Sequence, residues 1–240
     1  KLEDEVGYRL FVRDKRTVEL TDQGAQFRTF ARKTLENLRD VQEKLGKPEN
    51  TLSGEISIYC SVTAAQAVLS DIFRLFRQRH PGVHIHLETG DPAHAIDRVQ
   101  EGTAELTVAA RPDRLPPGLE FQNIMATPVV FIGPSMPCDV SDTIRADPIP
   151  WGSVPMILAE QALSRRFADE WFRVNGMKPE IYAEVAGHEA ILAMVRLGCG
   201  VGVVPELVLE QSSLKDEVRV IPVQPGLPPY QVGVCMHRRR

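Results

Sequence analysis

The sequence predicts an α/β protein built from two similar lobes, and three observations support this. From Gly54 onward, short β-prone runs alternate with runs whose apolar residues recur at helical spacing. The 240-residue chain is 43% hydrophobic and 25% charged, which is typical of a globular protein with one or two cores. The alternation also occurs twice, and an offset of 96 residues superposes Ile85 on Ile181, Glu88 on Glu184, Val99 on Val195, Gly102 on Gly198 and Val108 on Val204.

Both series place strands and helices in the same order, which predicts largely parallel sheets. In the first we expect strands at 56–60, 83–89, 106–110, 119–124 and 129–132 and helices at 65–79 and 92–101. In the second we expect strands at 156–159, 181–185 and 201–204 and helices near 163–175 and 189–197. Residues 54–134 plus 229–240 would form lobe I, and 135–228 lobe II. Crossovers at 126–134 and 230–235 would join them into a hinged, periplasmic-binding-protein-like cleft that holds a ligand.

The segment from Cys60 to Ala65 joins the first strand of lobe I to the first helix. A helix start offers unpaired N–H groups and partial positive charge, so Ser61, Val62, Thr63 and Ala64 are a candidate seat for a small carboxylate or phosphate. Ligands of open α/β sheets bind beyond the carboxyl ends of the strands, and this segment directly follows such an end. The alternative is that Ser61 or Thr63 only caps its own helix. Similar strand-to-helix turns occur at 89–91 and 186–189.

The first 50 residues hold 11 Lys+Arg against 10 Asp+Glu, whereas the remainder holds 17 against 22. Two short β-prone runs at 10–13 and 17–20 are joined by a charged turn. A helix tail, a glycine and a basic hairpin in this order are typical of a winged helix-turn-helix, whose wing contacts phosphates or a minor groove. The alternative is a solvated turn. The candidate DNA contacts are Arg9, Arg13, Lys15 and Arg16.

The sequence predicts one long helix over residues 22–46, which Thr21 can cap. Residues 46–50 would end this helix and form a hinge to the next domain. Its apolar seam recurs at alternating steps of four and three: Phe27, Ala31, Thr34, Leu38, Val41 and Leu45, widened by Phe30 and Leu35. A helix this long with such a seam favours packing against a partner helix. The alternative is packing against its own chain.

The residues at 1–24 have a specific order: Lys1-Leu2-Glu3-Asp4-Glu5, Gly7, Leu10-Phe11, Arg13, Arg16, Leu20-Thr21 and Gly24. They resemble the end of the recognition helix and the wing of LysR-type transcriptional regulators. Segments 128–134, 187–191 and 198–205 resemble that family's crossover strand and second-lobe elements. The resemblance covers essentially the whole chain. It implies a truncated winged helix-turn-helix at 1–21, a dimerising linker helix at 22–46, an effector-binding domain, operator DNA as partner, and a homodimer or homotetramer.

Segments 60–65, 89–91, 187–190 and 197–201 are similar to a branch of this family that activates branched-chain amino acid biosynthesis. That similarity implies acetolactate or acetohydroxybutyrate as inducer, each a small carboxylate with an adjacent hydroxyl and ketone. We expect the carboxylate to sit at Ser61, Thr63 and the Ala64 N–H. The remaining candidate contacts are Thr89 and Asp91 for the hydroxyl, Gly187, His188 and Glu189 from the other lobe, and Ala110 and Val204 for the wall.

Other functions receive less support from the sequence. The four cysteines are widely spaced and lack a C-x-x-C pair, and the histidines at 80, 84, 86 and 94 lack further metal ligands. Cys60 with His188 as base lacks a nucleophile elbow, so we expect no catalysis and no cofactor. No apolar run approaches the ~20 residues that cross a bilayer, and no signal peptide is evident, which favours a cytoplasmic regulator. A solute-binding protein for a small organic acid is the rival interpretation.

Overall fold

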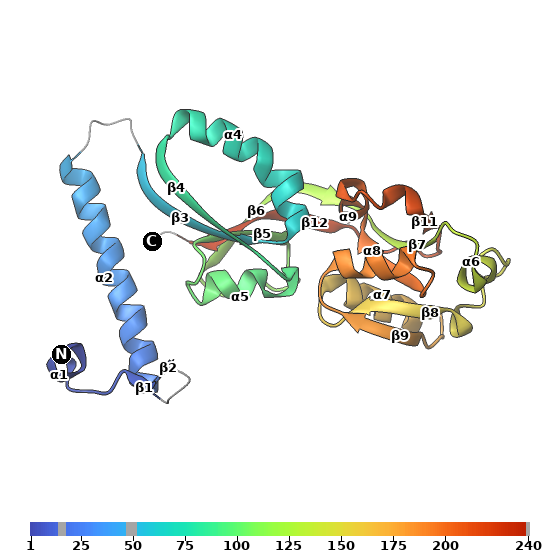
Figure 1. Cartoon of the computed structure of the whole chain (residues 1–240), viewed down its shortest axis with the longest axis horizontal. Coiled ribbons are helices and arrows are strands. Elements are labelled where there is room, and N and C mark those ends of the chain that lie inside the picture. The colour runs from blue at the N-terminus through green and yellow to red at the C-terminus, as the bar shows by residue number, and fades with distance from the viewer. Residues whose placement is uncertain (14–17, 47–51, 239–240) are drawn as a thin grey trace. The chain divides into compact units, whose positions relative to one another are not determined.

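The computed structural model describes residues 1–13, 18–46 and 52–238 (Figure 1). The chain divides into two compact units, Lys1–Ser53 and Gly54–Arg240. No helix in the described ranges is long and apolar enough to span a bilayer.

The first unit begins with a short helix tied to a hairpin. Helix α1 (Leu2–Val6) ends at Gly7, whose φ of 77° is the left-handed conformation that glycine adopts at low cost. Strands β1 (Phe11–Arg13) and β2 (Val18–Leu20) pair antiparallel, as the sequence predicts. The Glu3 carboxylate accepts hydrogen bonds from the backbone N–H groups of Leu10 at 2.7 Å and Phe11 at 3.0 Å. These bonds fix the hairpin against the helix.

Of the four candidate DNA contacts, Arg9 is exposed. The Arg13 backbone ends β1, but its side chain lies outside the described part of the chain. Lys15 and Arg16, at the tip of the predicted wing, also lie outside it. Their role in DNA binding stays a prediction.

Helix α2 (Asp22–Gly46) follows the hairpin over the residues that the apolar seam predicts. The Thr21 hydroxyl caps it by accepting from the Gly24 N–H at 2.9 Å, and also donates to the Arg9 carbonyl at 2.7 Å. Gly24 approaches the hairpin so closely that an added Cβ would lie 2.0 Å from the Leu10 oxygen. Four large apolar side chains of the helix are at least half exposed: Phe30 at 65%, Leu35 at 58%, Leu38 at 52% and Val41 at 50%. The predicted hinge at 47–50 lies outside the described residues.

The second unit contains two five-stranded sheets, one in each lobe. The order in lobe I is β4-β3-β5-β12-β6, with β3 (Ser53–Cys60), β4 (Gly82–Thr89), β5 (Leu106–Ala110), β6 (Leu119–Thr127) and β12 (Tyr230–His237). The order in lobe II is β11-β7-β10-β8-β9, with β7 (Val129–Pro134), β8 (Pro155–Ala159), β9 (Glu180–Val185), β10 (Val201–Pro205) and β11 (Val218–Ile221). Reversing the second order aligns β9-β8-β10 with β4-β3-β5, which is the internal repeat that the 96-residue offset indicates.

Helices cover these sheets. Lobe I carries α3 (Val62–Ala64), a π-helical turn η1 (Ala65–Leu69), α4 (Ser70–Arg79), η2 (Pro92–His94) and α5 (Ala95–Gln100). Figure 1 shows α4 and α5 on opposite sides of the strands. Lobe II carries α6 (Asp139–Thr143), η3 (Trp151–Ser153), α7 (Leu163–Val174), α8 (His188–Arg196), α9 (Glu206–Gln211) and η4 (Lys215–Glu217). Gly202 allows α8 to lie close on β10, since an added Cβ would be 2.3 Å from the Ile191 side chain.

The structure differs from the sequence prediction in three respects. Both sheets are mixed, because β12 pairs antiparallel with β5 and β7 pairs antiparallel with β10. The strand at 129–134, assigned to lobe I from the sequence, hydrogen-bonds in the sheet of lobe II, so the outward crossover is at Pro128. The sequence prediction also missed α6, α9 and β11, which are too short for a periodic signal.

Lobe II has an aromatic core around Phe131 of β7, which is fully buried. Its ring centroid lies 5.1 Å from that of Trp151 and 5.0 Å from that of Trp171. Phe172 packs edge-on against the same three rings. Such close aromatic packing adds to the stabilisation from buried area.

We expect Phe131→Ala to lower the free energy of unfolding by about 3–5 kcal/mol, because the cavity left among the rings can close only in part. Urea denaturation followed by tryptophan fluorescence measures this. As a control, Tyr182→Ala removes a ring that is 62% exposed and should change stability by less than about 0.5 kcal/mol. Equal losses in the two variants would contradict this account of the core.

Candidate functional site

Two adjacent cavities lie between the lobes. The inner one, about 60 Å³, is lined by Ser61, Thr63, Ala64, Pro92, Val108, Ala109, Ala110, Thr127, His188, Pro205, Leu207, Val208, Tyr230 and Val232. The outer one, about 410 Å³, is lined by Pro92, Ala93, Ile96, Ala110, Arg111, Pro112, Glu160, Gln161, Ala162, Leu163, Arg165, Arg166, His188 and Tyr230. His188 and Tyr230 border both. The larger volume is in the range of small-molecule sites.

The first helix start of lobe I contributes Ser61, Thr63 and Ala64 to the inner cavity. The Ser61 hydroxyl accepts a hydrogen bond from the Ala64 N–H at 3.1 Å, so it caps its own helix. The cap holds the hydroxyl at the cavity wall. Its oxygen retains a hydrogen that it can donate to a ligand.

Thr63 connects the two lobes. Its hydroxyl, on α3, donates to the Glu189 carboxylate on α8 at 2.7 Å. Thr63 is buried, whereas Glu189 is exposed. A negatively charged group from lobe II therefore occupies the hydroxyl that the sequence assigns to a ligand carboxylate.

Asp91 supports the wall of the cleft without lining either cavity. Its carboxylate accepts from the Ala93 N–H at 2.9 Å and so caps η2. The Tyr59 hydroxyl donates to the Asp91 carbonyl at 3.0 Å. These two bonds position Pro92, which borders both cavities.

His188 is a buried titratable residue of the cleft. Its Nε2 lies 3.0 Å from the Ser164 hydroxyl on α7. Burial lowers the pKa of His188 to about 4, although the nearby carboxylates of Glu189 and Asp91 act to raise it. The ring is therefore neutral at pH 7 and can donate from one nitrogen and accept at the other.

The structure brings together Ser61, Thr63, Ala64, Ala110 and His188 of the predicted site residues. The others do not line the cavities: Val62, Thr89, Asp91, Gly187, Glu189 and Val204. Val204 is fully buried in the core of lobe II. Gly187 instead serves as the N-cap of α8 with a φ of 80°.

The sequence prediction missed many residues that line the cavities, among them Thr127, Pro205, Leu207 and Tyr230, and it missed Ser164, which lines neither cavity but bonds to His188. They come from the crossovers and from the starts of α7 and α9, which lie far apart in the chain. The Thr127 hydroxyl accepts from the Leu207 N–H at 3.1 Å, and this bond joins the end of β6 to α9. Only the position of Tyr230 directly after Pro228-Pro229, at the start of a β run, gave a signal in the sequence.

Charged groups lie around the outer cavity. Arg166 forms an ion pair with Asp113 of lobe I, and Arg165 pairs with Asp169 and Glu184 within lobe II. The Arg111 guanidinium lies 5.8 Å from the centre of the Phe121 ring. Glu160 adds one carboxylate to the lining. The rim therefore attracts anions only weakly, because two of its three arginines are already paired.

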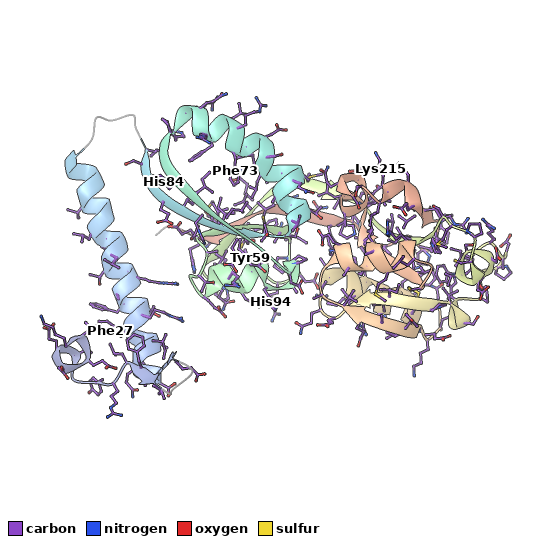
Figure 2. All side chains as sticks on the ribbon, in the orientation of Figure 1. Phe27, Tyr59, Phe73, His84, His94 and Lys215 are labelled. Atoms are coloured by element: carbon purple, nitrogen blue, oxygen red, sulfur yellow. The ribbon has the colours of Figure 1, made fainter. Side chains whose placement is uncertain are left out.

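Within the described residues no group of three His, Cys, Asp or Glu side chains could hold a metal ion. Figure 2 shows His84 on β4 and His94 at the end of η2, on separate elements of lobe I. All four cysteines are free thiols. Burial raises the pKa of Cys60 to about 11, so this thiol is protonated at pH 7 and a poor nucleophile.

Comparisons with known proteins give concordant results. Residues 49–240 match the LysR substrate binding domain. Over 243 aligned positions the chain is 42% identical to the HTH-type transcriptional activator IlvY of Salmonella typhimurium, an alignment that covers 100% of this chain and 82% of that protein. The crystal structure of HinK, a LysR family transcriptional regulator from Pseudomonas aeruginosa, aligns with a TM-score of 0.62 at 21% identity and covers 100% of this chain and 79% of that one.

A second solved structure, the effector binding domain of QuiR in complex with shikimate, aligns with a TM-score of 0.63 at 15% identity and covers 79% of this chain and 90% of that one. The family match over residues 49–240, with the two sheets and the cleft between them, thus defines a LysR-type effector-binding domain of two lobes. The chain belongs to the LysR family of transcriptional regulators.

The buried imidazole makes stability depend on pH. The ring titrates near 6.5 in the unfolded chain and near 4 in the folded one, so the unfolded chain binds more protons between these values. Stability should therefore fall as the pH drops from about 6.5, by up to about 3 kcal/mol near pH 4. His188→Gln lacks this titration, and the difference between the two proteins in urea denaturation at pH 7 and pH 4.5 isolates it. The same loss in both proteins would contradict a neutral, buried His188.

Proposed function

We propose that this protein is a transcriptional activator that controls branched-chain amino acid biosynthesis in response to a small carboxylate bound between its lobes. The observation that carries the proposal is the 42% identity to the IlvY activator along the entire chain. The cleft has the hydroxyl groups of Ser61 and Thr63 at one end and an apolar wall, which suit such a ligand.

Acetolactate or acetohydroxybutyrate is the proposed inducer. Its carboxylate would bind at Ser61, Thr63 and the Ala64 N–H, with Ala110 and His188 beside it, and the Ala64 N–H would then exchange its bond to the Ser61 hydroxyl for one to the ligand. Because Thr63 already donates to Glu189, the ligand carboxylate and the Glu189 carboxylate compete for the same hydroxyl. Binding would then favour a different arrangement of the lobes, and its differential affinity for the two arrangements sets the size of the response.

In the intact protein this change would be passed to operator DNA in the cytoplasm. We propose that residues 1–21 form the end of the recognition helix and the wing of a winged helix-turn-helix, where Arg9, Arg13, Lys15 and Arg16 contact the DNA. Residues 22–46 would pair two subunits, which gives a homodimer or homotetramer. The exposed apolar side chains of α2 support this role. Removing Phe30, Leu35 and Leu38 from water against a second helix would stabilise the pair.

A solute-binding protein for an organic acid is the second candidate, because its lobes have the same design. The first unit argues against it: a hairpin with basic residues and a long helix have no part in capturing a solute.

Calorimetric titration of the chain with acetolactate tests the proposal. We expect saturable binding without turnover of the ligand, and a roughly tenfold loss of affinity in Thr63→Val, which keeps the shape of the side chain but removes its hydroxyl. Thr143→Val is a matched control, because it makes the same exchange on α6 and Thr143 lines neither cavity. Failure of acetolactate and acetohydroxybutyrate to bind the wild-type chain would overturn the assigned inducer.

The pairing role of α2 has its own test. We expect Leu38→Asp to shift the chain from dimer toward monomer in analytical ultracentrifugation, because it places a charge in the predicted seam. Asn37→Asp puts the same charge at the adjacent exposed position outside the seam and should leave the assembly unchanged. A wild-type chain that is monomeric throughout the accessible concentration range would contradict pairing through this helix.

A further inference from the structure

The Tyr230 hydroxyl is a buried polar group that lacks a hydrogen bond. Tyr230 is 5% exposed, and within the described residues its hydroxyl has no partner at hydrogen-bonding geometry. The side chain borders both cavities of the cleft. Buried hydroxyls in folded proteins are nearly always paired with protein, water or ligand, so this one requires an explanation.

The start of α7 faces the same space. The helix has 12 residues, and within the described part of the chain no side chain caps its first turn. Its N-cap Ala162 and the following Leu163 and Arg165 line the outer cavity. First-turn N–H groups have no acceptor inside their own helix, so they can donate to a ligand in that cavity.

These two features converge at Ser164. The hydroxyl and N–H of Ser164 lie near the Tyr230 oxygen and partly offset the increase that burial causes in the pKa of Tyr230, which reaches about 12. Neither completes a hydrogen bond of ordinary geometry. At pH 7 the phenol is therefore neutral and retains its proton for donation. The adjacent wall is neutral too, because His188 is uncharged and bonded to the same serine.

We propose that Tyr230 and the start of α7 bind a second oxygen of the effector, a carbonyl oxygen distinct from the carboxylate held at Ser61–Ala64. This inference rests on the function proposed above and specifies the class of ligand as small keto acids. The Ser164 hydroxyl and N–H lie on the acceptor side of the Tyr230 oxygen, which leaves the phenol proton and the α7 backbone N–H groups as donors, so an acceptor oxygen of the ligand would pair with them. Tyr230 also borders the inner cavity with Ser61, Thr63 and Ala64, which places it beside a ligand seated there.

The position explains how the cleft would select its ligand. A ligand with a methylene group in place of the carbonyl leaves the tyrosine hydroxyl and the N–H groups unpaired in a water-poor site. Sites built to pair with a polar group reject analogues that lack it. Tyr230 is thus a specificity-determining residue. The ligand donors that lobe II contributes come from the start of α7, whereas the sequence predicts them at the start of α8.

Two ligands and two proteins test this. Acetolactate and 2-hydroxy-2-methylbutyrate differ only in that the second has a methylene group where the first has its ketone. We expect the wild-type 240-residue chain to prefer acetolactate by roughly tenfold or more in calorimetric titration. Tyr230→Phe should lose that preference, with weaker acetolactate binding and unchanged binding of the methylene analogue. Tyr182→Phe, at an exposed tyrosine on β9, should behave as wild type.

The outcomes separate the inference from the function beneath it. If wild type binds acetolactate and Tyr230→Phe keeps the preference, the assignment of Tyr230 fails while the proposed function stands. If Tyr230→Phe weakens both ligands equally, the residue is structural and the assignment also fails. If wild type binds neither acid, the proposed function fails and the inference fails with it.

Discussion

The cleft depends on the joint where the chain crosses between its lobes. Pro128 alone separates β6 of lobe I from β7 of lobe II, and β12 returns to pair antiparallel with β5 and β6. The Glu206 N–H donates to the Pro128 carbonyl at 2.8 Å, and the Leu207 N–H donates to the Thr127 hydroxyl at 3.1 Å. These bonds hold the start of α9 against the crossover, so the floor of the cleft is fixed while its walls belong to different lobes.

Two polar contacts also cross the cleft, in addition to the apolar cluster that both lobes share. Thr63 forms a hydrogen bond with Glu189. Arg166 forms an ion pair with Asp113, and the side chains of this pair are each 61% exposed. An exposed ion pair contributes roughly 0–1 kcal/mol. A ligand that gives one arrangement of the lobes a few kcal/mol of extra stability can outweigh polar contacts of this strength.

The polar groups inside the cleft are kept neutral, and the charged groups stay at its rim. Burial holds His188 uncharged and Tyr230 protonated, whereas Arg165 and Arg166 are paired with carboxylates outside the inner cavity. A neutral interior avoids the cost of burying an unpaired charge when no ligand is bound. It also lets backbone N–H groups and hydroxyls, rather than a cation, set which ligand binds.

Much of the fold could be predicted because it is encoded locally. The β-branched run at 201–204 forms the buried strand β10, and the apolar seam at 22–46 forms α2 with Thr21 as its cap. The 96-residue offset correctly pairs the strands of the two lobes. The predicted site residues do not all face the cavities, since Val204 turned into the core and Thr89 lies outside both. A strand-to-helix turn can be found from residue types, but the direction in which it faces depends on packing against distant elements.

By itself, then, the sequence determined the class of fold, the repeat and the order of the elements, because each follows from residue spacing along the chain. The family was indicated by the resemblance of its motifs and is shown by the match of residues 49–240 to the LysR substrate binding domain. Only the tertiary structure decided that β7 joins lobe II, that Glu189 occupies the Thr63 hydroxyl, and that Tyr230 meets the start of α7. Those contacts join residues as far apart as 126 positions, as with Thr63 and Glu189. They exist only once the crossovers bring the lobes together, and no local pattern in the sequence records them.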